Sequence, residues 1–245
     1  QRAFSGCTDL EHIALPETTV KYGACAFSGT YLTDVRFPAG TSYLGKGVLS
    51  NMPVLQQITL PDGLTSVGAE LFLGDKELKE VTLPSGLTAV SDGMFSGCTA
   101  LQSIDLPDTV AYIGESAFSG CTALTDLTFP AGLESFGREA LQGCSSLTEI
   151  TVPTGVHALP EAVFSGCSRL VNVNLPEGLT SIGPTAFQSC INLREISIPD
   201  SVQAIHGSAF EWALRLSDIR VGAGNPTYHT CLLYTSDAAD DTPCV

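Results

Sequence analysis

Apolar and polar positions follow one another along this chain in a pattern that returns every 23 residues. Prolines mark the period most clearly: the first interval is 22 residues and the other seven are 23. These prolines occupy positions 16, 38, 61, 84, 107, 130, 153, 176 and 199. Counted from each proline, large apolar residues recur at the third, sixth, eleventh, seventeenth, twentieth and twenty-second positions. Such a period predicts a solenoid in which every repeat forms one coil stacked on its neighbours.

The residues just before each proline have the alternation of a half-buried strand. In the segment 101–106, apolar side chains at Ile104 and Leu106 lie two residues apart, and polar residues stand between them. Proline cannot donate a ladder hydrogen bond and therefore ends the strand. The pattern predicts one short parallel strand per coil in one continuous sheet of about ten strands. The expected strand ends are residues 15, 37, 60, 83, 106, 129, 152, 175, 198 and 221.

The rest of each coil is expected to consist of extended and turn segments with little regular helix. A second extended piece covers residues 179–182 and runs into Gly183, which can turn the chain with a positive φ. Residues 185–188 are too few for more than one helical or 3₁₀ turn, and Phe187 within them is expected to point inward.

The charge and hydropathy of the chain narrow its possible partners. The formal net charge is −15, with 11 Lys and Arg against 26 Asp and Glu. This balance argues against binding to nucleic acid or to an anionic membrane, because neither phosphate-rich surface would find a cationic patch. No run of 18 apolar residues is present, so direct membrane insertion is not expected.

Cysteine is the most conspicuous chemical candidate. Five cysteines lie 23 residues apart, at positions 98, 121, 144, 167 and 190. Cys7 continues the series, and other coils have Thr30, Met52, Asp75 or Ala213 at this position. Side chains stacked in parallel point in the same direction, so we expect free buried thiols rather than disulfides.

The sequence predicts no catalytic residue, no cofactor and no metal site. Zinc would need two close pairs such as C-x₂-C, and none occurs. The four histidines fall at different repeat positions, and no GxSxG, HExxH, P-loop or GxGxxG pattern is present.

The outward face of the predicted sheet is the candidate partner-binding site. It consists of the residues four and two positions before each proline. The candidate residues are Asp34, Arg36, Glu80, Asp105, Asp126, Glu149, Asn172, Asn174, Glu195 and Asp218. Asp126 and Glu149 would be neighbours about 5 Å apart, which suits a carboxylate pair or calcium ligands. A solvated acidic stripe is the favoured interpretation, since no Asp-rich loop accompanies the pair.

The segment Ala117-Phe-Ser-Gly-Cys-Thr-Ala-Leu124, followed by a strand and Pro130, resembles the BspA-like leucine-rich repeats. The resemblance covers residues 1 to about 221 and implies a right-handed leucine-rich-repeat superhelix. Proteins of this family are typically large bacterial surface or exported molecules, and several look like adhesins. The resemblance therefore implies a host, neighbouring-cell or matrix protein as partner. Residues 225–228, Asn-Pro-Thr-Tyr, also resemble the turn that often follows such repeats.

Three segments are expected along the chain. Residues 1–221 form the repeat array, which starts in the middle of a repeat, and residues 222–230 form a post-repeat turn. Residues 231–245 resemble the translation of a sequencing adapter and are set aside; the alternative is a genuine acidic tail. Because an array that starts mid-coil leaves a strand edge uncovered, we expect isolated protein to associate end to end.

Three functions are compatible with these observations. The leading hypothesis is a non-catalytic, adhesin-like protein-binding module of a cell-surface or secreted bacterial protein. The alternative is a structural spacer that holds other domains away from the cell, and an enzyme fragment is the third possibility. A surface location rests on the family resemblance, because the sequence shows no export signal.

Overall fold

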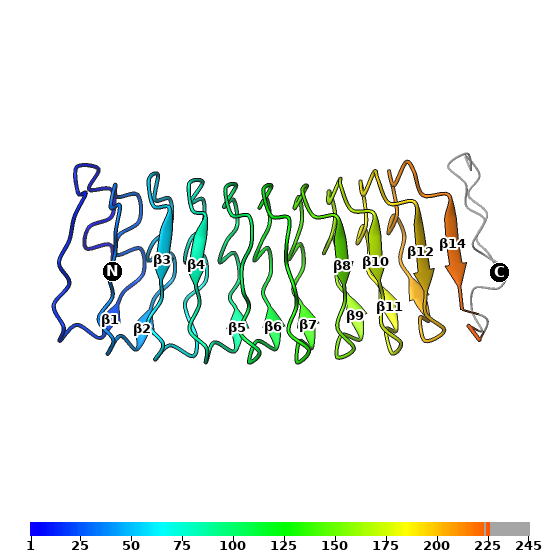
Figure 1. The fold of residues 1–245 in the computed structure, drawn as a ribbon, viewed down its shortest axis with the longest axis horizontal. Helices are drawn as coiled ribbons and strands as arrows, with labels where there is room; N and C mark the ends of the chain where they lie inside the picture. The colour runs from blue at the N-terminus through cyan, green and yellow to red at the C-terminus, as the bar shows by residue number, and fades with distance from the viewer. Residues whose placement is uncertain (223, 226–245) are drawn as a thin grey trace.

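The molecule is a single row of stacked coils, one coil for each repeat of the sequence. The computed structural model describes residues 1–222 and 224–225. Successive coils lie side by side from the N-terminal end to β14 (Figure 1). Strands and turns make up the described part of the chain, and no helix occurs within it. The predicted solenoid fold is confirmed.

One ladder of parallel strands forms from the residues that precede the prolines. We call its outward side the strand face. Its strands are β3 (Gln57–Thr59), β4 (Glu80–Thr82), β8 (Glu149–Thr151), β10 (Asn172–Asn174), β12 (Glu195–Ile198) and β14 (Asp218–Val221). Each paired residue lies 23 positions from its partner, as Gln57 does from Glu80. The repeat length therefore sets the register of the ladder.

A second ladder forms from the extended segment that follows each proline. Its strands are β1 (Lys21–Tyr22), β2 (Tyr43–Leu44), β5 (Ala89–Val90), β6 (Tyr112–Ile113), β7 (Ser135–Phe136), β9 (Ala158–Leu159), β11 (Ser181–Ile182) and β13 (Ala204–Ile205). Each of these strands has two residues, and the second residue is buried or half-buried. One side of this ladder therefore also faces the core. Figure 1 shows strands of both ladders, with the strand-face ladder above the second one, and between β4 and β8 only the second ladder forms strands.

The predicted parallel strands are observed, but the prediction that they form one continuous sheet is wrong. The described strands belong to six small sheets of two or three strands each. On the strand face, the two coils between β4 and β8 pair with each other only through an isolated bridge from Ser103 to Asp126. Because the strands are only two to four residues long, a small displacement of one coil is enough to break the ladder hydrogen bonds and end a sheet. Turn hydrogen bonds keep the coils joined there, such as Phe118 N–H to the Ala140 carbonyl at 2.8 Å.

The core is one cluster that runs the length of the array. Residues at the third position after proline, such as Leu87, Val110 and Leu133, are fully buried. Phenylalanine at the eleventh position stacks from coil to coil, with ring centroids 5.5 Å apart for Phe72 and Phe95. Leu49 and Leu141 occupy this position in two inner coils. Because these side chains pack against those of the neighbouring coils, no coil completes its core alone.

Glycines serve two different purposes in each coil. At the thirteenth position Gly120 has a φ of 73°, a left-handed conformation that favours glycine. Gly183, at the seventh position, does not take the positive φ that we expected. It is needed instead for close approach, because a Cβ there would lie 2.7 Å from the Leu159 carbonyl oxygen. The short segment 185–188 is a turn with Thr185 at a φ of 53°, and it contains no helical turn.

The column cysteines are free thiols, as predicted, and five of them are buried, whereas Cys7 is exposed. All seven cysteines of the described residues are free thiols. The column thiols donate to carbonyl groups of the preceding coil, as Cys121 does to Phe95 at 3.1 Å and Cys144 to Phe118 at 3.2 Å. Burial raises the pKa of the Cys121 thiol to about 12, which keeps it protonated and poorly reactive.

Asp75 places a carboxyl group in this apolar column. Its side chain is fully buried, and its Oδ1 accepts a hydrogen bond from the Met52 N–H at 2.7 Å. Its Oδ2 finds no hydrogen-bond partner among the described residues. Burial raises the Asp75 pKa to about 9, and the only titratable group beside it in the column is the Cys98 thiol. Asp75 therefore folds as a neutral acid.

The last described residue, Asn225, is hydrogen-bonded to the coil that precedes it. The Asn225 amide donates to the carbonyls of Pro199 at 3.2 Å and Val202 at 2.8 Å. Asn225 belongs to the segment 222–230, whose assignment as a post-repeat turn stays a prediction. Residues 226–230 of that turn, and the whole adapter-like segment 231–245, lie outside the described residues.

We predict that Gly183→Ala destabilises the array by roughly 1–3 kcal/mol, because the new methyl group would meet the Leu159 carbonyl. Gly132→Ala is the matched control, since its Cβ would meet nothing closer than the Asp108 carbonyl oxygen at 3.6 Å. Urea unfolding should separate the two variants. Equal losses of stability in both would refute close approach as the reason for glycine.

We predict that Asp75→Cys stabilises the protein and flattens its stability between pH 5 and 8. The unfolded carboxyl ionises near its ordinary pKa of 3.8, whereas the folded one ionises near 9. Its neutral form is therefore favoured by folding, and stability falls as pH rises from about 4 toward 9. Asp75→Asn, which keeps the shape, should flatten the profile as well. Urea titrations that give all three proteins the same pH slope would contradict the burial of a neutral Asp75.

Candidate functional site

The strand face presents the side chains that the sequence pattern assigned to it. In β8, Ile150 is buried while Glu149 and Thr151 on either side of it are exposed. The same alternation recurs along the array because each strand turns one face to the core. Nine of the ten predicted residues are exposed, and Asp218 is half-buried. Their predicted outward orientation is thus observed, whereas their part in binding is a separate matter.

Some of these residues contact one another across the coils. Glu149 pairs with Asn172 in the ladder between β8 and β10. The Asn174 amide donates to Thr151 Oγ1 at 3.1 Å and to Glu149 Oε1 at 3.5 Å. These bonds hold polar side chains in register along the face.

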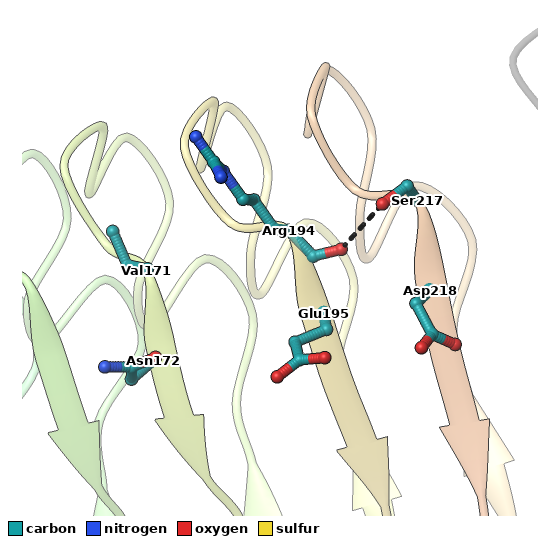
Figure 2. Close-up of a pocket in the computed structure, with 6 residues that line it drawn as sticks. All are labelled: Val171, Asn172, Arg194, Glu195, Ser217 and Asp218. Atoms are coloured by element: carbon teal, nitrogen blue, oxygen red, sulfur yellow. Dashed lines mark hydrogen bonds between the residues drawn. The ribbon is translucent and has the colours of Figure 1, made fainter.

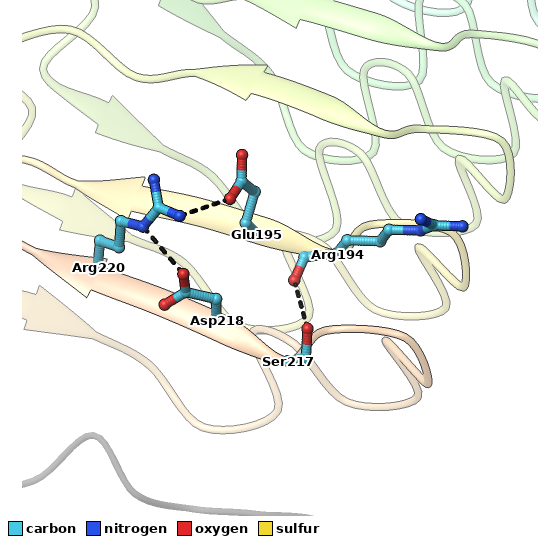
Figure 3. A network of polar contacts seen from close by, with 5 residues as sticks. All are labelled: Arg194, Glu195, Ser217, Asp218 and Arg220. Atoms are coloured by element: carbon cyan, nitrogen blue, oxygen red, sulfur yellow. Dashed lines mark hydrogen bonds and ion pairs between the residues drawn. The ribbon is translucent and has the colours of Figure 1, made fainter.

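Arg220 organises the C-terminal end of the strand face. Its Nη2 lies 2.9 Å from Glu195 Oε2, and its Nε lies 2.9 Å from Asp218 Oδ2 (Figure 3). One guanidinium thus forms ion pairs with two of the predicted acidic residues. Arg220 was not among the predicted site residues, although its position two before the end of the repeat is also that of Arg36, which pairs with Asp34 at 2.9 Å.

The middle of the strand face has no such compensation. Within the described residues, no ion pair reaches Glu80, Asp105, Asp126 or Glu149. These four carboxylates are exposed and come from four successive coils. The face therefore carries carboxylates without ion pairs at its centre, whereas arginine pairs with the acidic residues at both ends.

Two open hollows lie on this face. One is lined by Val171, Asn172, Arg194, Glu195, Ser217 and Asp218 (Figure 2). The Ser217 hydroxyl donates to the Arg194 carbonyl there at 3.4 Å, while the Arg194 side chain points away from the acids. The other hollow lies beside Asp105 and Asp126, where the ladder is interrupted. Both hollows are open to solvent and run along the strands, which suits an extended macromolecular surface better than a small substrate.

The geometry gives no reason to assign metal or acid–base chemistry to the face. No cluster of three His, Cys, Asp or Glu side chains suited to a metal ion occurs in the described part of the chain. Asp126 bridges to Ser103 and Glu149 pairs with Asn172, so the two carboxylates share no ladder pairing in that part. The described residues also include no helix of the length and apolarity that a membrane span requires.

Stacked coils with a polar outer ladder define the class of leucine-rich-repeat proteins. The family model of the BspA type leucine rich repeat region matches the chain in six copies, over residues 1–102 and 88–217. The chain therefore belongs to the BspA-type leucine-rich repeat family.

Solved structures of bacterial leucine-rich repeat proteins have the same fold. A protein from Bacteroides ovatus is 29% identical, with a TM-score of 0.65 over 91% of this chain and 69% of that one. The T. pallidum leucine rich repeat protein is 27% identical, with a TM-score of 0.57 over 71% of each chain. A leucine rich cell surface protein from Faecalibacterium prausnitzii is 26% identical, with a TM-score of 0.51 over 90% of this chain and 75% of that one. No curated protein matches the chain.

Proposed function

We propose that this chain is a non-catalytic protein-binding module of a bacterial cell-surface or secreted protein, and that its strand face receives the partner. The observation that carries the proposal is the row of exposed carboxylates at Glu80, Asp105, Asp126 and Glu149, none of which makes an ion pair within the described residues. Exposed charges that the protein itself leaves uncompensated suit a partner of opposite charge. The partner is thus a protein with a surface rich in Lys and Arg.

The rigidity of the face supports the same function. Its backbone is held by ladder pairing at β4 and at β8, and between them by the Ser103–Asp126 bridge and the Thr125 N–H to Gln102 carbonyl bond at 3.0 Å. The spacing of the carboxylates is therefore largely fixed before binding, which lowers the entropic cost of association. The face has few aromatic residues, so electrostatic attraction over a wide area contributes more than any single anchor.

The surface location is inferred from relatives. The family resemblance implies exported proteins, and the Faecalibacterium prausnitzii relative is described as a cell surface protein. An adhesin-like role against a host, neighbouring-cell or matrix protein follows from a basic partner at such a location. The alternative is a spacer, which the continuous core from coil to coil would also suit.

We predict that the double charge reversal Asp126→Lys and Glu149→Lys weakens partner binding at least 10-fold. Biolayer interferometry against purified basic and acidic matrix proteins would measure this, with the chain in solution. Wild-type protein should bind at least one basic member saturably, and binding should weaken as salt rises from 50 to 300 mM, because counterions screen exposed charges.

The matched control is the double reversal Glu115→Lys and Glu134→Lys. Both residues are exposed but lie outside the strand face. This control should leave affinity within about two-fold of wild type. If both double variants lose affinity equally, net charge rather than the strand face governs binding. If no basic protein binds saturably, the spacer function is favoured.

A further inference from the structure

A second surface carries exposed apolar side chains. It lies along the edge of the array where the turns meet the strand face. We call it the turn-edge patch and define it by Ile191, Trp212, Leu214, Arg194 and Arg215. Trp212 is 62% exposed, Leu214 is 72% exposed and Ile191 is 39% exposed. Trp212 is also the single tryptophan of the whole chain. Ile191 and Leu214 occupy the same repeat position in adjacent coils and thus lie side by side.

The repeat positions of these side chains can be compared with the same positions in inner coils. Tyr31 occupies the position of Ile191 and Leu214 and is 43% exposed. This position therefore points outward within the array. At the position of Trp212, Asn51 is exposed, whereas residues such as Gly120 and Ser189 are half-buried, so the high exposure of Trp212 is specific to its own coil.

The backbone at Trp212 is not the one that a tryptophan would select. The φ of Trp212 is 59°, in the left-handed region. Two residues at the same repeat position in inner coils are Gly120, with a φ of 73°, and Gly143, with a φ of 71°. A bulky side chain at positive φ costs conformational energy. The Trp212 indole is largely in solvent, so burial in the core does not offset this conformational cost. Strain of this kind at an exposed aromatic residue favours a functional use.

Cationic groups flank the apolar side chains. Arg194 and Arg215 are exposed, and neither makes an ion pair within the described residues. The Arg194 side chain extends toward the turn edge, away from Glu195 and Asp218 (Figure 3). Arg215 donates only to the Asn192 amide oxygen at 2.8 Å.

The nearby acids already have partners of their own. Glu195 and Asp218 pair with Arg220, and Glu211 accepts a hydrogen bond from the Gln188 amide at 2.7 Å. The turn-edge patch therefore places two guanidinium groups that make no ion pair within the described residues beside its apolar side chains, in a protein whose net charge is −15. Tryptophan and arginine are also the residues most enriched at the energetic centres of protein interfaces.

We propose that the turn-edge patch docks a peptide segment of another protein in which large apolar side chains are flanked by Asp or Glu. The apolar residues contact Trp212 and Leu214, and the carboxylates pair with Arg194 and Arg215. A peptide fits these observations better than a lipid surface, because the acidic remainder of the chain repels anionic membranes. This docking does not depend on the strand face or on its basic partner.

The test uses the full chain and a phage-displayed library of random 12-residue peptides. Enriched peptides should share a large apolar residue within two positions of Asp or Glu. A synthetic enriched peptide without tryptophan should shift Trp212 fluorescence to shorter wavelength, because binding removes the indole from water. Leu214→Ser and Arg215→Ser should each weaken its binding at least 10-fold. Trp212→Gly, which restores the usual repeat residue, should abolish binding while the unfolding midpoint stays equal or rises.

Several outcomes would overturn the proposal. The first is that no peptides are enriched, and the second is that the enriched peptides contain Asp or Glu no more often than the library does. The third is that wild type and the Leu214→Ser or Arg215→Ser variant bind the peptide equally well. A fluorescence shift produced by phosphatidylserine vesicles alone would instead assign the patch to membranes, and one produced by raising the protein concentration alone would assign it to a second copy. The strand-face reversal of Asp126 and Glu149 should leave peptide binding unchanged, so the two surfaces succeed or fail separately.

Discussion

The structure depends on the contact of each coil with the next one. Backbone groups of one coil bond to the coil beside it, as Phe118 N–H does to the Ala140 carbonyl, and column thiols do the same, as Cys121 does to the Phe95 carbonyl. Stacked rings such as Phe95 on Phe118, with centroids 5.2 Å apart, complete the core across the same boundary. A single coil lacks these partners, so it cannot offset its own loss of conformational entropy. The constant repeat length follows, because a change in length would misalign every one of these contacts.

This constraint separates the positions that hold the array from those that are free to recognise partners. Inward positions accept few chemistries, and the buried Asp75 carboxyl shows how poorly a polar group is accommodated there. Outward positions on the strand face and the turn edge vary without disturbing the stack. The chain uses this freedom in two ways, with unpaired carboxylates such as Asp126 at the centre of the strand face and an apolar, cationic group around Trp212 at its C-terminal edge. The acidic face and the turn-edge patch thus present opposite chemistries on one rigid scaffold.

The sequence was sufficient to predict the structural features that depend only on the repeat period. The proline interval located the coils, the apolar columns and the outward strand positions, and parallel stacking of equivalent residues accounted for the free thiols. It did not predict the second ladder, the interruption at Ser103, or the contact distance that requires glycine at position 183, because these depend on small displacements between coils. The pairing of Arg220 with two acids was also missed, although an arginine at the equivalent position 36 was a usable signal. Side-chain reach across coils cannot be read from a repeat pattern.

The most direct test of coil stacking is to remove one coil and compare the result with the removal of part of a coil. Deleting residues 107–129 joins Leu106 to Pro130 and restores the repeat, whereas deleting 107–118 breaks it. Urea unfolding followed by circular dichroism should give a cooperative transition for the first deletion, with an m-value roughly a tenth below that of the parent chain. The second deletion should unfold the array or lower its midpoint sharply. If the 23-residue deletion were as damaging as the 12-residue one, the coils would not be interchangeable units held by their neighbours.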